Sequence, residues 1–290
     1  FEEGPSWGDV NDYLYILQEI DLEEIGQTDF DLVIMDYSLE GDDDSKFTFE
    51  EITDLKNSTG GKLVLAYMSI GEAETYRWYW EKKWDMNGDG KPDPDAPSWL
   101  GPSNPEWPEN YKVRYWEPEW KELVYDYLDR VVEAGFDGVY LDIIDAYEYW
   151  GPWGESGLNR STAERDMVEF VLEIAEYARE TSNKTGFGVF PQNGEALSVH
   201  MDYVEAVTGI GKEDTWYDGD DRQPVNYTEE TIRHLDRFRD AEKLVLAIDY
   251  PEDADSVRDF YLRALEQGYV PYVSNRDLDK VNFVAGFMPD

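Results

Sequence analysis

The chain has 290 residues, with 66 Asp and Glu against 25 Lys and Arg, a formal net charge of −41 and no cysteine. The absence of cysteine excludes disulfides, thiolate catalysis and thiolate metal sites, and the negative charge argues against a nucleic-acid partner, since phosphate binding needs a basic face. No apolar stretch approaches the ~20 residues that a membrane-spanning helix needs.

Eight strand-like hydrophobic runs alternate with helical patterns along the chain, an order typical of βαβ units and a parallel sheet. We therefore expect one (β/α)8 barrel over residues 1–290. The predicted strands begin near Tyr13 (YLYIL), Asp31 (DLVIMD), Lys62 (KLVLAYM), Asp137 (DGVYLD), Gly186 (GFGVFP), Tyr203 (YVEAVT), Lys243 (KLVLAID) and Tyr269 (YVPYVS).

The intervening helices are predicted from apolar spacing and terminal signals. The clearest stripe runs from Trp120 to Val132 and stops at Gly135, and the last runs from Val257 to Leu265 before Gly268. Capping-box patterns and threonines predict where three other helices begin, at Thr48 with Glu51, Ser161 with Glu164, and Thr228 with Thr231.

An insertion from about 71 to 117 interrupts this rhythm, because it is too long for an ordinary strand-to-helix loop. It contains Trp78, Trp80, Trp84, Trp99, Trp107 and Trp116, with Trp120 just after it. The tryptophans could form a small core for the insertion or a wall on which sugar rings stack. We expect a mixture of the two.

The insertion also contains a D-x-N-x-D-G-x-x-D pattern. Its candidate metal ligands are Asp85, Asn87, Asp89 and Asp93, and Gly90 stands at the sharp turn of an EF-hand-like loop. Ala96 occupies the twelfth position, where an EF-hand has a bidentate Glu. The pattern predicts either a structural calcium ion or a metal-free loop of Asx turns. No cofactor is expected for catalysis.

Five of the predicted strands end on or just before a carboxylate: Asp36, Glu72, Asp142, Glu195 and Asp249. A charge beside a core is costly without a partner or a task, and parallel strands would gather these acids at one mouth. Each acid alone could cap a helix or pair with an Arg. Asp142 and Glu195 follow the fourth and fifth strands, and we expect them to face one another as the two carboxylates of sugar hydrolysis.

Several segments resemble glycoside hydrolase family 114. They are Asp31 to Tyr37, Ser69 to Glu74, Tyr76 to Trp80, Trp99 to Gly101 with Asn104-Pro105, Phe136 to Tyr147, and Gln192 to Glu195. The resemblance covers nearly the whole chain. It implies a (β/α)8 barrel of an extracellular or secreted protein, endo-α-1,4-polygalactosaminidase activity on galactosamine-containing exopolysaccharide, and catalytic acids at Asp142 and Glu195. Because the chain begins at Phe1, we expect it to have been processed or trimmed, so that a signal peptide would not be visible.

The other strand-end residues are expected to bind substrate. Carboxylates would bind sugar hydroxyls or ammonium groups, and aromatic residues would add hydrogen bonds and stacking. These candidates are Asp36, Tyr37, Tyr67, Glu72, Asp145, Tyr147, Trp150, Asp249 and Tyr250. We expect retention of the anomeric configuration, which requires carboxyl groups about 5 Å apart, against roughly 6.5–9.5 Å for inversion.

Two alternatives to this hydrolase stay open. One is a carbohydrate-binding barrel without turnover, and the other is a metal-dependent lyase that uses several of the acids. The acidity likewise has two interpretations, a solvated surface suited to high salt or attraction of a cationic amino sugar. The acids are spread along the whole chain, which favours the first interpretation.

Overall fold

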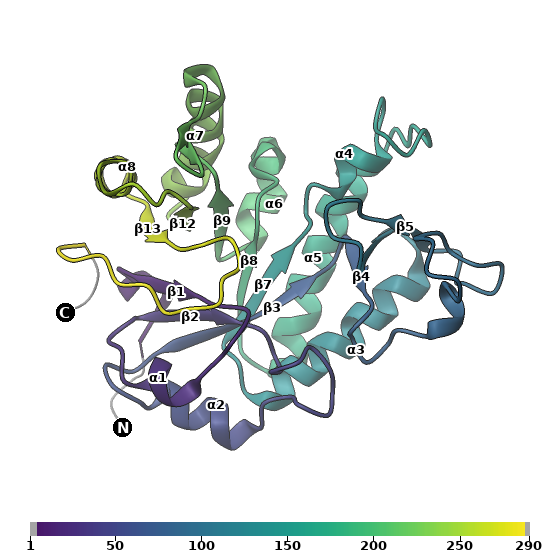
Figure 1. Ribbon diagram of the computed structural model, residues 1–290, viewed down its shortest axis with the longest axis horizontal. Helices are drawn as coiled ribbons and strands as arrows, with labels where there is room; N and C mark the ends of the chain where they lie inside the picture. The colour runs from purple at the N-terminus through teal and green to yellow at the C-terminus, as the bar shows by residue number, and fades with distance from the viewer. Residues whose placement is uncertain (1–4, 288–290) are drawn as a thin grey trace.

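The computed structural model describes residues 5–287, and eight of its strands run parallel in the order of a (β/α)8 barrel (Figure 1). Five form one hydrogen-bonded arc, β1-β2-β3-β7-β8, and three form a second, β13-β12-β9. A parallel bridge between Gln192 and Gly211 joins the two arcs on one side. The strands are β1 (Tyr13–Tyr15), β2 (Leu32–Met35), β3 (Leu63–Ser69), β7 (Gly138–Asp142), β8 (Gly188–Pro191), β9 (Gly209–Glu213), β12 (Leu244–Asp249) and β13 (Val270–Val273).

On the other side β1 and β13 lie next to one another, but no ladder between them is found in residues 5–287. Ring contacts occupy this seam, with the centroids of Tyr13 and Tyr272 5.4 Å apart. Tyr15 meets Tyr140 from β7 at 5.2 Å. The barrel interior is therefore packed with aromatic side chains, which leaves a ligand only the mouth.

Helices alternate with the strands on the outside (Figure 1). They are α1 (Leu22–Gly26), α2 (Phe49–Lys56), α3 (Pro118–Ala134), α4 (Ala146–Trp150), α5 (Ala163–Ser182), α6 (Met201–Ala206), α7 (Val225–Asp240) and α8 (Ala254–Gln267). Short 3₁₀ turns are η1 (Trp7–Asp9), η2 (Lys82–Trp84) and η3 (Glu195–Val199), and a small antiparallel pair is β10 (Tyr217–Asp218) with β11 (Asp221–Arg222).

Most of the helix signals are confirmed. Thr48 and Glu51 form the predicted capping box, and α3 and α8 end before glycines with φ of +88° and +75°. The capping box at Ser161 is wrong, because α5 starts after Thr162 without a side-chain cap. Helix α7 begins at Val225, three residues before Thr228.

Seven of the eight predicted strands are confirmed to within about two residues, and the sixth is wrong. The segment at Tyr203 is helix α6, in which Tyr203 and Val204 are buried and Glu205 is exposed, and the C-cap residue Val207 is buried at the same helical spacing. The sixth strand is instead β9, the sequence GIGKE. A Cβ at Gly211 would collide with the hydroxyl of Tyr140, and one at Gly209 with the ring of Phe190, so this strand lacks a hydrophobic run.

The insertion forms a lobe beside α3 and α4, built on the antiparallel sheet β4-β6-β5 (Figure 1). Its strands are β4 (Glu72–Glu74), β5 (Leu100–Ser103) and β6 (Asn110–Val113). A chain of ring contacts runs from Trp80 through Trp84 and Trp99 to Trp120 at centroid distances of 5.1, 5.3 and 4.9 Å. Most of the insertion's tryptophans therefore form its core.

Candidate active site

A groove of about 780 Å³ lies at the mouth where the parallel strands end. Residues at or just after the ends of β1, β2, β3, β7, β8, β9 and β12 line it, and the insertion and the loop after β13 supply the rest of its walls. Nine of the lining residues are acidic: Asp36, Glu40, Glu74, Glu106, Glu109, Asp142, Asp145, Glu213 and Asp277. Arg276 is the only Lys or Arg among the described residues that line it.

Asp142 is the last residue of β7 and lies on this groove as predicted. The Tyr67 hydroxyl donates to Asp142 Oδ2 at 2.7 Å, and the Ile143 N–H donates to Oδ1 at 2.8 Å. Ile143 has φ of +58°, a strained conformation for a β-branched residue, and such strain is concentrated at functional sites. Burial raises the pKa of Asp142 to about 7, the Tyr67 hydroxyl lowers it, and the nearby charge of Glu213 raises it further.

Glu213 is the last residue of β9 and faces the same groove. It accepts hydrogen bonds from the Asn193 side-chain amide at 2.8 Å and from the Tyr250 hydroxyl at 2.9 Å. Burial and the Glu213 charge raise the pKa of Tyr250, which keeps that hydroxyl protonated as a donor. Two carboxylates, each held by a tyrosine hydroxyl, therefore border one groove from β7 and β9.

Glu195, the expected partner of Asp142, is not among the residues that line the groove. Asn193 and Gly194, with φ of +60° and +64°, turn the chain away after β8, and Glu195 begins the 3₁₀ turn η3. Its carboxylate lies 3.9 Å from the ammonium of Lys212. The geometry therefore places Asp142 and Glu213 on the groove and leaves Glu195 off the groove, beside Lys212.

Of the expected substrate-binding residues, Asp36, Tyr67, Asp145 and Tyr250 line the groove, but Asp36 is already paired with Arg77 at 2.8 Å. Burial raises the pKa of Asp145 to about 6. The insertion also contributes Glu106, Trp107 and Glu109 to the groove. The two glutamates were not expected at the site, and Trp107 was expected only as one of the tryptophans on which sugars could stack.

The remaining candidates lie off the groove and have other contacts. Asp249 is fully buried and accepts three backbone N–H bonds from residues 215–217 at 2.8–2.9 Å, so it anchors a loop. Glu72 is buried and pairs with Lys112 at 2.9 Å. Tyr37, Tyr147 and Trp150 are also absent from the lining, and buried Trp150 packs edge-on against Trp116.

The Asp-rich loop is folded by hydrogen bonds from its own backbone N–H groups to its aspartates. Asp85 accepts N–H bonds from Gly88 and Gly90 at 2.8 Å each and a hydroxyl bond from Tyr111 at 2.6 Å. Asp93 accepts the Met86 N–H at 2.8 Å. Among the described residues, no group of three or more His, Asp or Glu is placed to hold a metal ion.

Because these oxygens already have donors, we expect removal of divalent ions to leave the stability of the protein unchanged. Thermal unfolding in millimolar Ca²⁺ and in EDTA tests this, with Asp85→Asn as the matched variant. A melting temperature that rises with Ca²⁺ in the wild type and not in Asp85→Asn would instead establish the calcium loop.

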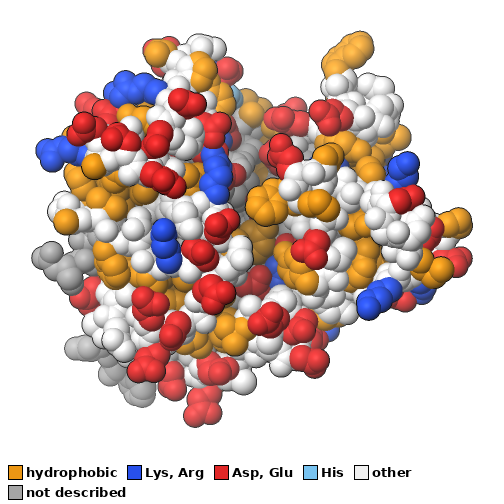
Figure 2. Space-filling model, viewed as in Figure 1, with side chains coloured by type: hydrophobic (Ala, Val, Ile, Leu, Met, Phe, Trp, Pro, Cys, Tyr) orange, Lys and Arg blue, Asp and Glu red, His pale blue; other side chains and the backbone are white. Residues whose placement is uncertain are grey.

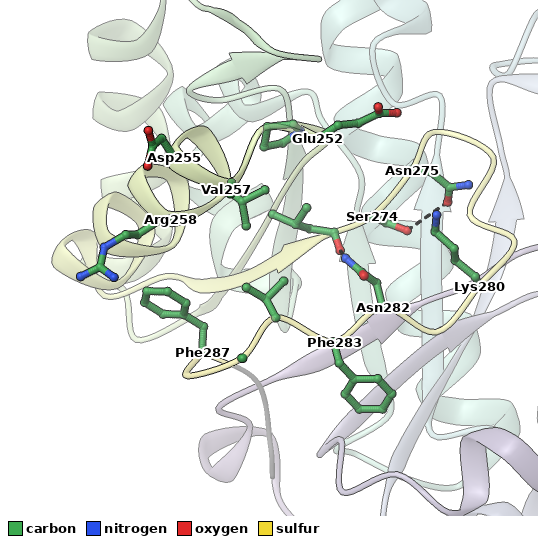
Figure 3. Close-up of a pocket in the computed structure, with 15 residues that line it drawn as sticks. Glu252, Asp255, Val257, Arg258, Ser274, Asn275, Lys280, Asn282, Phe283 and Phe287 are labelled. Atoms are coloured by element: carbon green, nitrogen blue, oxygen red, sulfur yellow. Dashed lines mark hydrogen bonds between the residues drawn. The ribbon is translucent and has the colours of Figure 1, made fainter.

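A second hollow of about 800 Å³ lies between α8 and the segment that follows β13 (Figure 3). Arg258 and Asp255 on α8 and Lys280, Phe283 and Phe287 on the C-terminal segment border it (Figure 3). Among the described residues, its acids are Glu252 on the loop after β12 and Asp255 on α8, and none of the strand-end carboxylates lines it.

The buried acids make stability depend on pH. Burial raises the pKa of Asp142 and of Asp249 to about 7 from the ordinary value of 3.8. Between about pH 4 and 7 the folded chain therefore binds more protons than the unfolded chain, and the free energy of unfolding falls as pH rises. We expect a higher urea midpoint at pH 5.5 than at pH 8, measured in about 1 M NaCl to screen surface charge.

Asp142→Asn is the control for this pH effect, because it removes one of the titrating groups. The difference between the two urea midpoints should be smaller in this variant than in the wild type. A wild-type midpoint that rises from pH 5.5 to pH 8 would contradict the prediction.

An α/β barrel whose strand-end carboxylates border an open groove has the architecture of a glycoside hydrolase. The family model described as glycoside-hydrolase family GH114 matches residues 9–286. The chain is 40% identical over 282 residues to the uncharacterized protein MJ1477 of Methanocaldococcus jannaschii, a match that covers 93% of this chain and 78% of that protein. It is 38% identical to an uncharacterized protein of Thermotoga maritima, covering 96% and 85%. The chain belongs to glycoside-hydrolase family GH114.

Solved structures support the fold. The glycoside hydrolase domain of PelA from Pseudomonas aeruginosa superposes with a TM-score of 0.66 at 19% identity and covers 94% of this chain and 97% of that domain. The structure of Aspergillus fumigatus Ega3 in complex with galactosamine gives a TM-score of 0.69 at 17% identity, covering 96% and 95%. The described helices include none long and apolar enough to cross a membrane.

Proposed function

We propose that this glycoside hydrolase cleaves a cationic, galactosamine-type polysaccharide, with Asp142 and Glu213 as its catalytic carboxylates. The observation that carries the proposal is their placement at the ends of β7 and β9, on one groove, each hydrogen-bonded by a tyrosine hydroxyl. Hydrolysis needs one carboxyl group protonated and one ionised. Burial and the neighbouring Glu213 keep the pKa of Asp142 near 7, so in the free enzyme the proton rests there.

The charge of the groove supports an amino-sugar substrate. Within residues 5–287, nine acids and one arginine line it, and a field of one sign in a cleft attracts an oppositely charged ligand. Figure 2 also shows acidic side chains scattered over the visible face of the molecule, so attraction begins outside the groove. Trp107 is 60% exposed at the groove wall, where its ring can stack on a sugar.

The Ega3 complex contains galactosamine, which supports the same sugar class here. The polysaccharide that the family resemblance implies is an exopolysaccharide, so we also propose that the protein works outside the cell.

The test is hydrolysis of partly de-N-acetylated polygalactosamine, followed by reducing-end release and by the masses of the oligosaccharides formed. The fully N-acetylated polymer is the matched control, because it has the same backbone without charge. We expect faster cleavage of the cationic polymer, a bell-shaped pH profile of kcat/KM, and a kcat/KM that falls as salt rises.

The alternative, a carbohydrate-binding barrel without turnover, makes a different prediction in the same experiment. Saturable polymer binding without reducing-end release at any pH would favour it and would reject the hydrolase.

A further inference from the structure

Lys212 is a buried cation that the proposed reaction does not use. It precedes Glu213 on β9, so the two side chains point to opposite faces of the strand. Only 6% of Lys212 is exposed, and burial of an ammonium is costly without partners. Its Nζ lies 3.2 Å from Asn193 Oδ1, 3.2 Å from the Tyr227 hydroxyl and 3.9 Å from Glu195 Oε1.

Asn193 connects this cation to the groove. Its Oδ1 accepts from Lys212, and its Nδ2 donates to Glu213 Oε1 at 2.8 Å. The Glu213 N–H also points to Oδ1, at 3.3 Å. The backbone N–H of Asn193 donates to Gly211 O at 2.8 Å, which fixes the amide beside β9.

An amide has one acceptor end and one donor end. With Lys212 bound to the oxygen, only the nitrogen can face Glu213, and it donates to the ionised carboxylate. Without Lys212 the amide oxygen keeps only the longer contact from the Glu213 N–H, at 3.3 Å, so the amide is held less firmly. The cation therefore strengthens the orientation in which the nitrogen of Asn193 meets the catalytic acid.

We propose that Lys212, held by Glu195 and Tyr227, is a positioning residue that orients the Asn193 amide and thereby sets the ionisation of Glu213. This rests on the role of Glu213 in the proposed function. It also gives Glu195 a task away from the groove, as the counter-ion of the positioning lysine.

The other groups that act on Glu213 are on neighbouring elements and are the same residues in every variant. Tyr250 after β12 donates to it, and the charges of Asp142, Asp145 and Asp214 act on it from β7 and from the loops after β7 and β9. Tyr15 on β1 and Tyr140 on β7 are buried, and burial raises the pKa of each, so they remain neutral.

The experiment is a ¹³C-carboxyl NMR titration of Glu213 in the full chain, with the signal assigned by its loss in Glu213→Gln. Lys212→Met removes the positive charge and the hydrogen bond that holds the Asn193 amide. Together these losses should raise the pKa of Glu213 by about one unit. In Glu195→Gln, loss of an anion should lower it, because Lys212 stays protonated at the acid pH of the titration. A general packing defect would not move the pKa in opposite directions in the two variants.

Two further variants complete the test. Lys212→Arg keeps the cation and should restore most of the wild-type value. Lys243→Met is the matched control, because Lys243 is a partly buried lysine that binds backbone carbonyls at the far end of neighbouring β12. It should leave the titration unchanged.

Kinetics on the cationic polymer give a second readout. Lys212→Met should lower kcat about tenfold with KM within about twofold, and the limb of the pH profile that reports Glu213 should move with the NMR value. An unmoved Glu213 titration in Lys212→Met, or equal shifts in Lys212→Met and Glu195→Gln, would overturn the positioning role. If the wild type releases no reducing ends, the proposed function fails. The NMR titration would still show whether Lys212 acts on Glu213 through Asn193.

Discussion

Glu213→Gln is expected to lower kcat on the cationic polymer by about 10²–10⁴-fold, the usual contribution of a catalytic acid or base. The variant keeps the size of the side chain and one oxygen, which can accept from either Asn193 or Tyr250, but it can neither ionise nor transfer a proton. Asp142→Asn should lose activity to a similar degree. Glu195→Gln should stay within about tenfold of the wild type, because its carboxylate lies off the groove and faces Lys212.

The comparison needs proof that each variant folds. Thermal unfolding should place Glu213→Gln within a few degrees of the wild type. Azide added to the Asp142→Asn and Glu213→Gln reactions shows whether either variant is rescued and which glycosyl azide anomer forms, which distinguishes nucleophile from acid/base and retention from inversion. Near-wild-type kcat in Glu213→Gln, with a large loss in Glu195→Gln, would show that Glu195, and not Glu213, is the second catalytic carboxylate.

The barrel could be predicted because seven of its strands carry continuous apolar runs, the mark of strands buried on both faces. Asp142, Tyr67 and Tyr250 could also be placed at the mouth, because each lies in or directly after such a run and faces the groove. Strand-end position is thus informative wherever the strand itself is visible in the sequence.

Glu213 was missed because its strand carries no such run. In β9 the rings of Tyr140 and Phe190 take the space that side chains would fill, so glycines replace apolar residues. The adjacent helix α6 carries Tyr203 and Val204, which gave the stronger but misleading strand signal. The available clue was the GIGKE segment, which ends on an acid at the spacing expected of a further strand.

The strand-end rule also fails where backbone direction changes within one or two residues. Asp249 ends β12 as predicted, yet its side chain meets three N–H groups of the loop after β9. Glu195 is separated from β8 by Gln192 and the two left-handed residues Asn193 and Gly194. Sequence position gives the end of a strand, but the direction of the side chain depends on loops whose conformation has no periodic pattern.

The second large effect is expected from Arg77→Met, which should destabilise the fold by about 3–5 kcal/mol, because it leaves buried carboxylates without their counter-ion. The Arg77 side chain is 0% exposed. It binds both oxygens of Asp36 at 2.8 Å and Glu74 at 2.6 Å. Its guanidinium also lies over the ring of Tyr76, 5.0 Å from the centroid.

We expect the melting temperature of Arg77→Met to fall by roughly 10 °C at pH 8. The deficit should shrink toward pH 5, because protonation of Asp36 and Glu74 removes the cost of burying these charges without their counter-ion. Arg77→Met combined with Asp36→Asn and Glu74→Gln is the matched control and should recover much of the loss by removing the stranded charges. A single variant as stable as the wild type at pH 8 would contradict the prediction. Since Asp36 and Glu74 line the groove, the same arginine neutralises these two acids and leaves Asp142, Asp145 and Glu213 with no arginine partner among the described residues.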